Sequence, residues 1–165
     1  MRTLLYLALF FNILTLSNCK KSNDAITHIN CDGLITDTLG TNDNAKIYIP
    51  NGFTPNNDGL NDMYRPVTYN VASIIFIVYD EQNNVVFTTN QLNQGWQTTV
   101  ANNSFTKYYY KMQAITQSNH KIGMCGEVFK LACIPNDFPT ALQMEDQITA
   151  NGFVGTTNDY LPVCP

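Results

Sequence analysis

Short apolar segments separated by turns rich in Asn and Gly are the feature that most constrains how this chain can fold. Residues 73–79 read Ser-Ile-Ile-Phe-Ile-Val-Tyr, a nearly continuous apolar run typical of a central strand. Further strands are predicted at residues 46–49, 84–89, 105–115 and 121–131. No convincing amphipathic helix precedes residue 139. The spacing therefore predicts an all-β fold, a small antiparallel Ig-like β-sandwich over residues 46–133.

The low charge of the chain agrees with this prediction. Only 13% of the residues are charged, against roughly 25% in an ordinary soluble domain. Asn, Thr, Gln and Tyr replace the missing charges, which suits an extracellular β module. The net charge of −4 gives no attraction for nucleic acid or anionic lipid, so we expect no nucleic-acid partner.

The amino terminus carries an export signal. An apolar run at residues 4–16 follows Arg2 and is too short to span a membrane. It ends at Leu-Ser-Asn-Cys, which resembles a bacterial lipobox and predicts a signal peptide at residues 1–18, a lipidated Cys19 and a polar tether at residues 19–45. The alternative is a plain signal peptide with Cys19 as a disulfide partner. The favoured location is the bacterial cell envelope, as an outer-membrane lipoprotein facing the periplasm or the surface.

The odd number of cysteines supports lipidation of Cys19, because pairing the five cysteines in disulfides would leave one unpaired. With Cys19 acylated, four disulfide candidates remain: Cys31, Cys125, Cys133 and Cys164. A Cys125–Cys133 bond is disfavoured, because a strand of that length spans roughly 26 Å and disulfide Cα atoms lie within about 7 Å. Of the other two connectivities we favour Cys31–Cys125 with Cys133–Cys164 and leave the crossed one open. Either would pin a C-terminal extension, residues 134–165, to the sandwich.

The sharpest local signature is the segment 49–62, Ile-Pro-Asn-Gly-Phe-Thr-Pro-Asn-Asn-Asp-Gly-Leu-Asn-Asp. It resembles the opening motif of the gliding-motility-associated C-terminal domain family, whose members act as type B sorting modules of the type IX secretion system. Later landmarks of that family follow in order: a hairpin at 77–87, Gly95-Trp96, a tyrosine-rich strand at 107–111 and a closing strand at 126–131. The resemblance covers residues 46–132 and implies a β-sandwich with an export role.

The chain departs from this family in two places that bear on function. Gln97-Thr98 follows the tryptophan where the family usually has Asp-Gly, and residues 134–165 follow a domain that normally ends its protein. We therefore expect a non-enzymatic envelope lipoprotein whose sandwich is an interaction or adhesion module for envelope or surface proteins. The alternative is a sorting module recognised by the export apparatus.

The polar loop of the motif has two interpretations. Its side chains Asn56, Asn57, Asp58, Asn61 and Asp62 could cap backbone amides in successive turns. They could also bind calcium, with Asp58 and Asp62 as the carboxylate ligands, although the spacing does not fit the EF-hand template. Turn capping is favoured, calcium stays open, and no other cofactor is expected.

Neither the aromatic residues nor the catalytic motifs searched for give strong support to sugar binding or catalysis. Trp96 and the run Tyr108–Tyr110 could form a sugar-binding platform, but burial in the core is favoured because alternate strand residues face opposite sides. The chain has no Gly-x-Ser-x-Gly elbow and no phosphate-binding Gly-rich loop. We therefore expect no enzyme, and a hydrolase with an unrecognised site is only a second alternative.

Overall fold

The computed structural model describes residues 28–41, 43–100, 104–136, 138 and 141–165. The predicted signal peptide and Cys19 lie outside the described residues. Within the described part, no helix is long and apolar enough to cross a bilayer.

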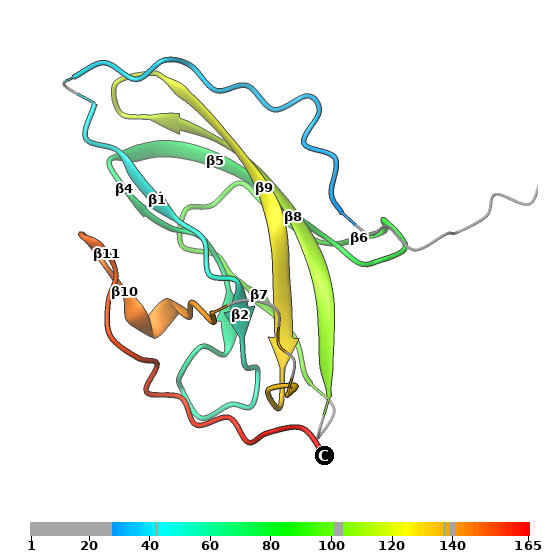
Figure 1. Cartoon of the computed structure of the whole chain (residues 1–165). Helices are drawn as coiled ribbons and strands as arrows, with labels where there is room; N and C mark the ends of the chain where they lie inside the picture. Colours follow the sequence, from blue (N-terminus) through cyan, green and yellow to red (C-terminus); the bar gives the residue numbers. More distant parts are fainter. Residues whose placement is uncertain (1–27, 42, 101–103, 137, 139–140) are drawn as a thin grey trace, which may run out of the picture.

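A five-stranded sheet forms the main layer of the molecule (Figure 1). Its strands are β2 (Gly52–Phe53), β5 (Val71–Tyr79), β6 (Val85–Thr89), β8 (Phe105–Thr116) and β9 (Lys121–Leu131). Their spatial order is β2-β9-β8-β5-β6, and all pairs are antiparallel except the parallel pair β2–β9. The long β8–β9 ladder forms because β8 is rich in aromatic and β-branched residues and a tight turn joins it to β9.

Two small strand pairs face this sheet. β1 (Lys46–Tyr48) pairs with β4 (Val67–Tyr69), and β3 (Met63–Tyr64) pairs with β7 (Trp96–Gln97). The main hydrophobic core joins inward side chains of the large sheet to residues of these pairs. On β5 the inward residues Ile74, Phe76 and Val78 are buried, whereas the outward Ile75 is 55% exposed, as the two-residue period of a strand requires.

Aromatic rings occupy the centre of this core. Tyr64 of β3 is completely buried and lies 5.5 Å from Phe53, 5.4 Å from Phe76 and 6.3 Å from Tyr110, between ring centroids. Trp96 of β7 lies 5.4 Å from Phe53. Contacts at these separations each stabilise by about 0.5–1.5 kcal/mol beyond area burial, so the rings tie β3 and β7 to the main sheet.

The first described residues form a strap over the outward face of the sheet (blue in Figure 1). We call residues 31–37 the N-terminal strap. The Cys31–Cys125 disulfide joins it to the middle of β9, with Cα atoms 5.8 Å apart. The carboxamide of Gln113 accepts a hydrogen bond from the Ile35 N–H and donates one to the Ile35 carbonyl, both at 2.8 Å. Part of the predicted tether is therefore packed against the sheet.

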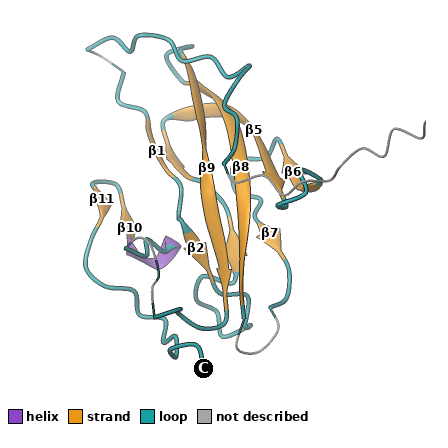
Figure 2. Cartoon of the chain, turned by 45° about the vertical axis from the view of Figure 1, so that its right-hand side comes forward, coloured by secondary structure: helices purple, strands orange, loops and turns teal. Residues whose placement is uncertain are grey.

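The C-terminal extension, residues 134–165, wraps the lower end of the sandwich (Figure 2). It contains a 3-10 turn, Glu145–Gln147, and the short hairpin of β10 (Ile148–Thr149) and β11 (Gly152–Phe153). Phe129, Leu131 and Met144 are the buried residues of a second, smaller core, against which Phe138, Leu142 and Leu161 pack. The Cys133–Cys164 disulfide closes the extension, with Cα atoms 4.9 Å apart.

The all-β fold class is confirmed, and the two disulfides pair Cys31 with Cys125 and Cys133 with Cys164, the connectivity favoured over the crossed one in the sequence analysis. Two details differ from the sequence prediction. The motif segment, expected as turns, contributes β2 and leads directly into β3, and the Trp96 loop contributes β7. These strands are two residues long, too short to produce a two-residue periodicity in the sequence.

Candidate functional site

The motif segment lies at the β2 end of the sheet and exposes only its tip. Pro50 and residues 52–55 are buried, whereas residues 56–59 are exposed. Asn57 and Asn61 take the left-handed conformation, with φ of 65° and 50°, which Asn tolerates better than most residues. The motif is therefore a rigid base with a small polar turn projecting into solvent.

Two aspartates hold the shape of this turn. Asp58 accepts hydrogen bonds from the Leu60 N–H at 2.8 Å and from the Asn56 side-chain amide at 2.9 Å. Asp62 reaches back across the loop and accepts bonds from the Asn57 N–H at 2.6 Å and from the Gly59 N–H at 2.8 Å. All four carboxylate oxygens therefore accept N–H groups of the loop, which is the turn-capping arrangement.

The same contacts bear on the calcium prediction. The side-chain oxygen of Asn56 accepts the Asp58 N–H at 3.0 Å, and that of Asn61 accepts the Asp146 N–H at 3.0 Å. Calcium at Asp58 and Asp62 would have to replace hydrogen bonds that shape the loop. No group of three His, Cys, Asp or Glu side chains that could hold a metal occurs among the described residues. Calcium binding at this loop stays an untested prediction.

The C-terminal extension clamps the base of the motif. The side-chain amide of Asn51 donates to the Ala141 carbonyl at 2.9 Å and accepts the Gln143 N–H at 2.7 Å, while the Asn51 N–H donates to the Gln143 carbonyl at 3.0 Å. At Gly52 a Cβ atom would lie 2.9 Å from the Leu142 side chain. A side chain at this position of the motif would displace Leu142, so the extension packs closely over Gly52.

A polar network, missed by sequence reasoning, joins the far side of the motif to the extension. Thr157 donates to the Asp146 carboxylate at 3.0 Å, and Thr54 and Asn61 both donate to one oxygen of Asp159. Asp159 is only 6% exposed, and its other carboxylate oxygen has no hydrogen-bond partner within the described structure. Nothing local in the Pro-rich sequence of the extension marks these aspartates.

The candidate sugar platform is not an exposed surface. Trp96 and Tyr110 are each 9% exposed and Tyr109 is fully buried. The Tyr108 ring meets Trp96 edge-on at 4.8 Å. Burial raises the pKa of the Tyr110 hydroxyl. These aromatic residues therefore serve the packing of both sheet faces.

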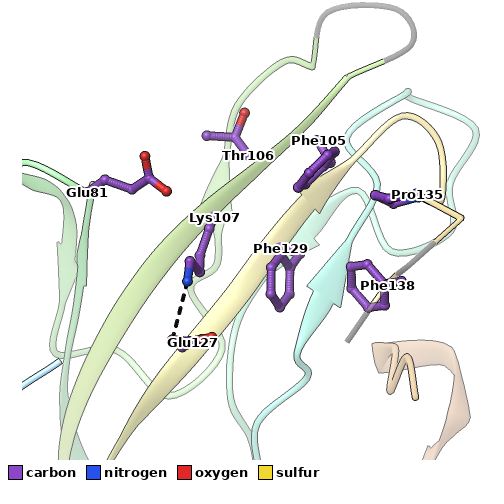
Figure 3. A pocket seen from close by; sticks show the side chains of 8 residues that line it. All are labelled: Glu81, Phe105, Thr106, Lys107, Glu127, Phe129, Pro135 and Phe138. Atoms are coloured by element: carbon purple, nitrogen blue, oxygen red, sulfur yellow. Dashed lines mark ion pairs between the residues drawn. The ribbon is translucent and has the colours of Figure 1, made fainter. Parts of the chain in front are cut away.

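An open groove lies over β8 and β9, on the face of the sheet that carries Lys107, Glu127 and Phe129 (Figure 3). Its volume is about 560 Å³. One side is apolar, and the other is charged. The residues that line it are Glu81, Phe105, Thr106, Lys107, Glu127, Phe129, Pro135 and Phe138.

Comparison with known proteins gives one match. The model of the type IX secretion signal domain family matches residues 47–126. No curated protein and no solved structure matches the chain. The matched residues begin at β1 and end within β9, and they include the whole exposed turn of the motif.

Proposed function

Residues 47–126 form a type IX secretion signal domain, and we propose that this domain targets the protein to the type IX export apparatus. The family match is the observation that carries the proposal, since it spans the motif and the strands of the main sheet. It agrees with the family resemblance of the motif and places the protein in the cell envelope or outside the cell. Sorting therefore takes precedence over adhesion as the leading function.

The exposed turn at residues 56–59 is the part of the motif that an export component could contact. The flanking residues are buried against the aromatic core or under the C-terminal extension. Asp62 fixes the turn from outside its tip through two backbone N–H groups. A preformed turn loses little conformational entropy on binding, which supports its use as a recognition element.

The test is export of an Asp62→Ala variant in the native host. We expect the variant to accumulate in the periplasm, because the turn loses two hydrogen bonds that fix its shape. Asp80→Ala is the matched control: Asp80 caps the β5–β6 turn through the N–H groups of Gln82 and Asn84, at 3.0 and 2.8 Å. Cell fractionation and quantitative immunoblotting measure the distribution, and thermal melting verifies that both variants fold.

The two variants separate recognition from stability. Export lost in Asp62→Ala and retained in Asp80→Ala at equal thermal stability supports the proposal. Equal export of both variants would exclude the turn as the recognised element. Continued export after removal of residues 46–132 would overturn the sorting function itself.

The second candidate is an envelope lipoprotein whose domain contacts envelope or surface proteins. The lipobox-like sequence that ends at Cys19 supports it. Acylation would attach the protein to the outer membrane whether or not export depends on the domain. The intact mass of the mature protein, measured with and without reduction, tests this: two or more acyl chains at Cys19 support the anchor, and an unmodified mature chain excludes it.

We propose further that the domain works without enzymatic activity and without a cofactor. The carboxylates of Asp58 and Asp62 already accept four N–H donors in the loop. Titration of the protein with calcium, followed by thermal melting, is expected to leave the melting temperature unchanged. A saturable rise that Asp62→Asn abolishes would instead establish a calcium site.

A further inference from the structure

The outer-face groove brings together side chains from four elements of the chain. Glu81 comes from the β5–β6 turn, Lys107 and Glu127 come from β8 and β9, and Phe138 comes from the C-terminal extension. Its volume of about 560 Å³ lies within the ~300–1,000 Å³ of typical ligand pockets. Neither the family match nor the proposed sorting function assigns a role to this groove.

One side of the groove is aromatic. Phe129 and Phe138 meet edge-on, with ring centroids 4.8 Å apart, and the extension thereby fixes the Phe129 ring against the sheet. Phe105 stands beside them and is 48% exposed. An aromatic ring exposed next to a rigid aromatic pair is the kind of anchor around which binding energy concentrates.

The other side carries an excess of negative charge. Lys107 is held by Glu127, with Nζ and Oε1 3.5 Å apart, and lies 5.5 Å from the centre of the Tyr109 ring. The ammonium group of Lys107 therefore already interacts with Glu127 and with the Tyr109 ring. Glu81 has no hydrogen bond or ion pair among the described residues, and Figure 3 shows its side chain on the charged side of the groove. One carboxylate therefore remains for a ligand.

We propose that this groove binds a peptide segment of a partner protein in which Arg or Lys stands next to an aromatic or aliphatic residue. The apolar side chain packs on Phe105 and the Phe129–Phe138 pair, and the cation pairs with Glu81. Charge complementarity selects this occupant: an acidic segment would be repelled by Glu81, and a neutral one would leave its carboxylate unpaired. The proposal goes beyond the sorting function and stands independently of it.

The test uses two probes of the same shape, acetyl-Phe-Arg-amide and acetyl-Phe-citrulline-amide, which differ by one charge. Binding to the mature protein with Cys19→Ser is measured by calorimetry or by NMR titration. We expect the Arg probe to bind with a Kd of about 0.1–1 mM, as for a single small pocket. The citrulline probe should bind about fivefold more weakly, and added salt should reduce this difference.

Two variants locate the site. Glu81→Gln should lower affinity for the Arg probe to that for the citrulline probe while leaving the citrulline affinity unchanged. Phe105→Ala should weaken both probes about tenfold. The matched control is Asp32→Asn, which removes the same charge from the strap on the same face of the sheet and should change neither affinity.

Each outcome decides the proposal. Equal affinity for the two probes, or an Arg preference that survives Glu81→Gln, would overturn the assignment of the cation to Glu81. Absence of binding by the folded protein at millimolar probe would overturn the groove as a peptide site. Loss of Arg preference in Asp32→Asn would show that general electrostatics, and not Glu81, sets the selectivity.

Discussion

The N-terminal strap and the C-terminal extension hold the same sheet by different means. Each is joined by one disulfide and by one side-chain carboxamide that bonds both an N–H and a C=O of the segment, Gln113 for the strap and Asn51 for the extension. Each segment also packs closely over a glycine of the sheet. A Cβ at Gly123 would lie 2.7 Å from the Leu34 side chain of the strap, and one at Gly52 would lie 2.9 Å from the Leu142 side chain of the extension. A disulfide, a carboxamide that forms two hydrogen bonds and a glycine together allow a segment without strand periodicity to pack against a sheet.

The two segments differ in what they bury. The extension contributes Met144, completely buried, to a small core of its own. The strap leaves Ile35 50% exposed and makes mainly polar contacts. The extension is therefore held by hydrophobic burial in addition to its disulfide, whereas the strap depends on its disulfide and its hydrogen bonds.

The largest effect should come from the strap disulfide. Its ring spans 94 residues of sequence separation and that of the extension spans 31. On the chain-entropy model, Cys31→Ala with Cys125→Ala should lower the free energy of unfolding by about 4–5 kcal/mol, against about 3–4 kcal/mol for Cys133→Ala with Cys164→Ala. Urea unfolding measures both.

Limited proteolysis should also distinguish the strap from the extension. The strap should become cleavable when its disulfide is removed, whereas the extension should stay protected without its own because Met144 and Leu142 remain packed. Cleavage of the extension before the strap in the matching variants would contradict the role of hydrophobic burial in holding the extension.

Core burial gives the next effect. Met144→Ala should cost about 2–5 kcal/mol, since it leaves a cavity in the small core. The strap counterpart is Ile35→Ala, which should cost less than about 1 kcal/mol because half of that side chain is already in water. Thermal melting with both disulfides intact compares them, and equal losses would show that the strap buries more in solution than the structure indicates.

The two carboxamides should have smaller and similar effects. Asn51→Ala and Gln113→Ala each remove two hydrogen bonds to a docked segment, and each should cost about 1–2 kcal/mol. Amide hydrogen exchange separates them, because Asn51→Ala should speed exchange at residues 141–147 and Gln113→Ala at residues 31–37. Faster exchange at both segments in either variant would mean that strap and extension are coupled.

The smallest effect concerns acid stability near the far end of the strap. A hydrogen bond from His120, the Ala45 N–H and the Thr116 hydroxyl hold the pKa of Asp43 below its ordinary value of 3.8. A carboxyl whose pKa is lower in the folded state stabilises the fold above the unfolded pKa, and that stabilisation is lost as the pH falls through the folded pKa. His120→Gln should therefore unfold at a higher pH during acid titration, as followed by circular dichroism. An unchanged midpoint would show that Asp43 titrates alike in both states.

The strands and the family could be predicted from the sequence, because the pattern that identifies each one lies in neighbouring residues. The apolar run at residues 73–79 predicted a strand that lies within β5. The strand predicted at residues 121–131 coincides with β9. The motif at 49–62 predicted the family that residues 47–126 match. Strand length also disfavoured a Cys125–Cys133 bond, because backbone geometry sets the reach of a strand, but it left the choice between the other two connectivities open.

Tertiary structure alone decided how distant residues meet. Gln113 and Ile35 are 78 residues apart and Asn51 and Ala141 are 90 apart, so no local pattern records their contacts. The Asp159 network, the parallel pairing of β2 with β9 and the groove beside Phe105 share this property. The physical reason is that periodicity encodes which face of a strand is buried, whereas a hydrogen bond or a pocket wall requires the completed fold to bring its partners together.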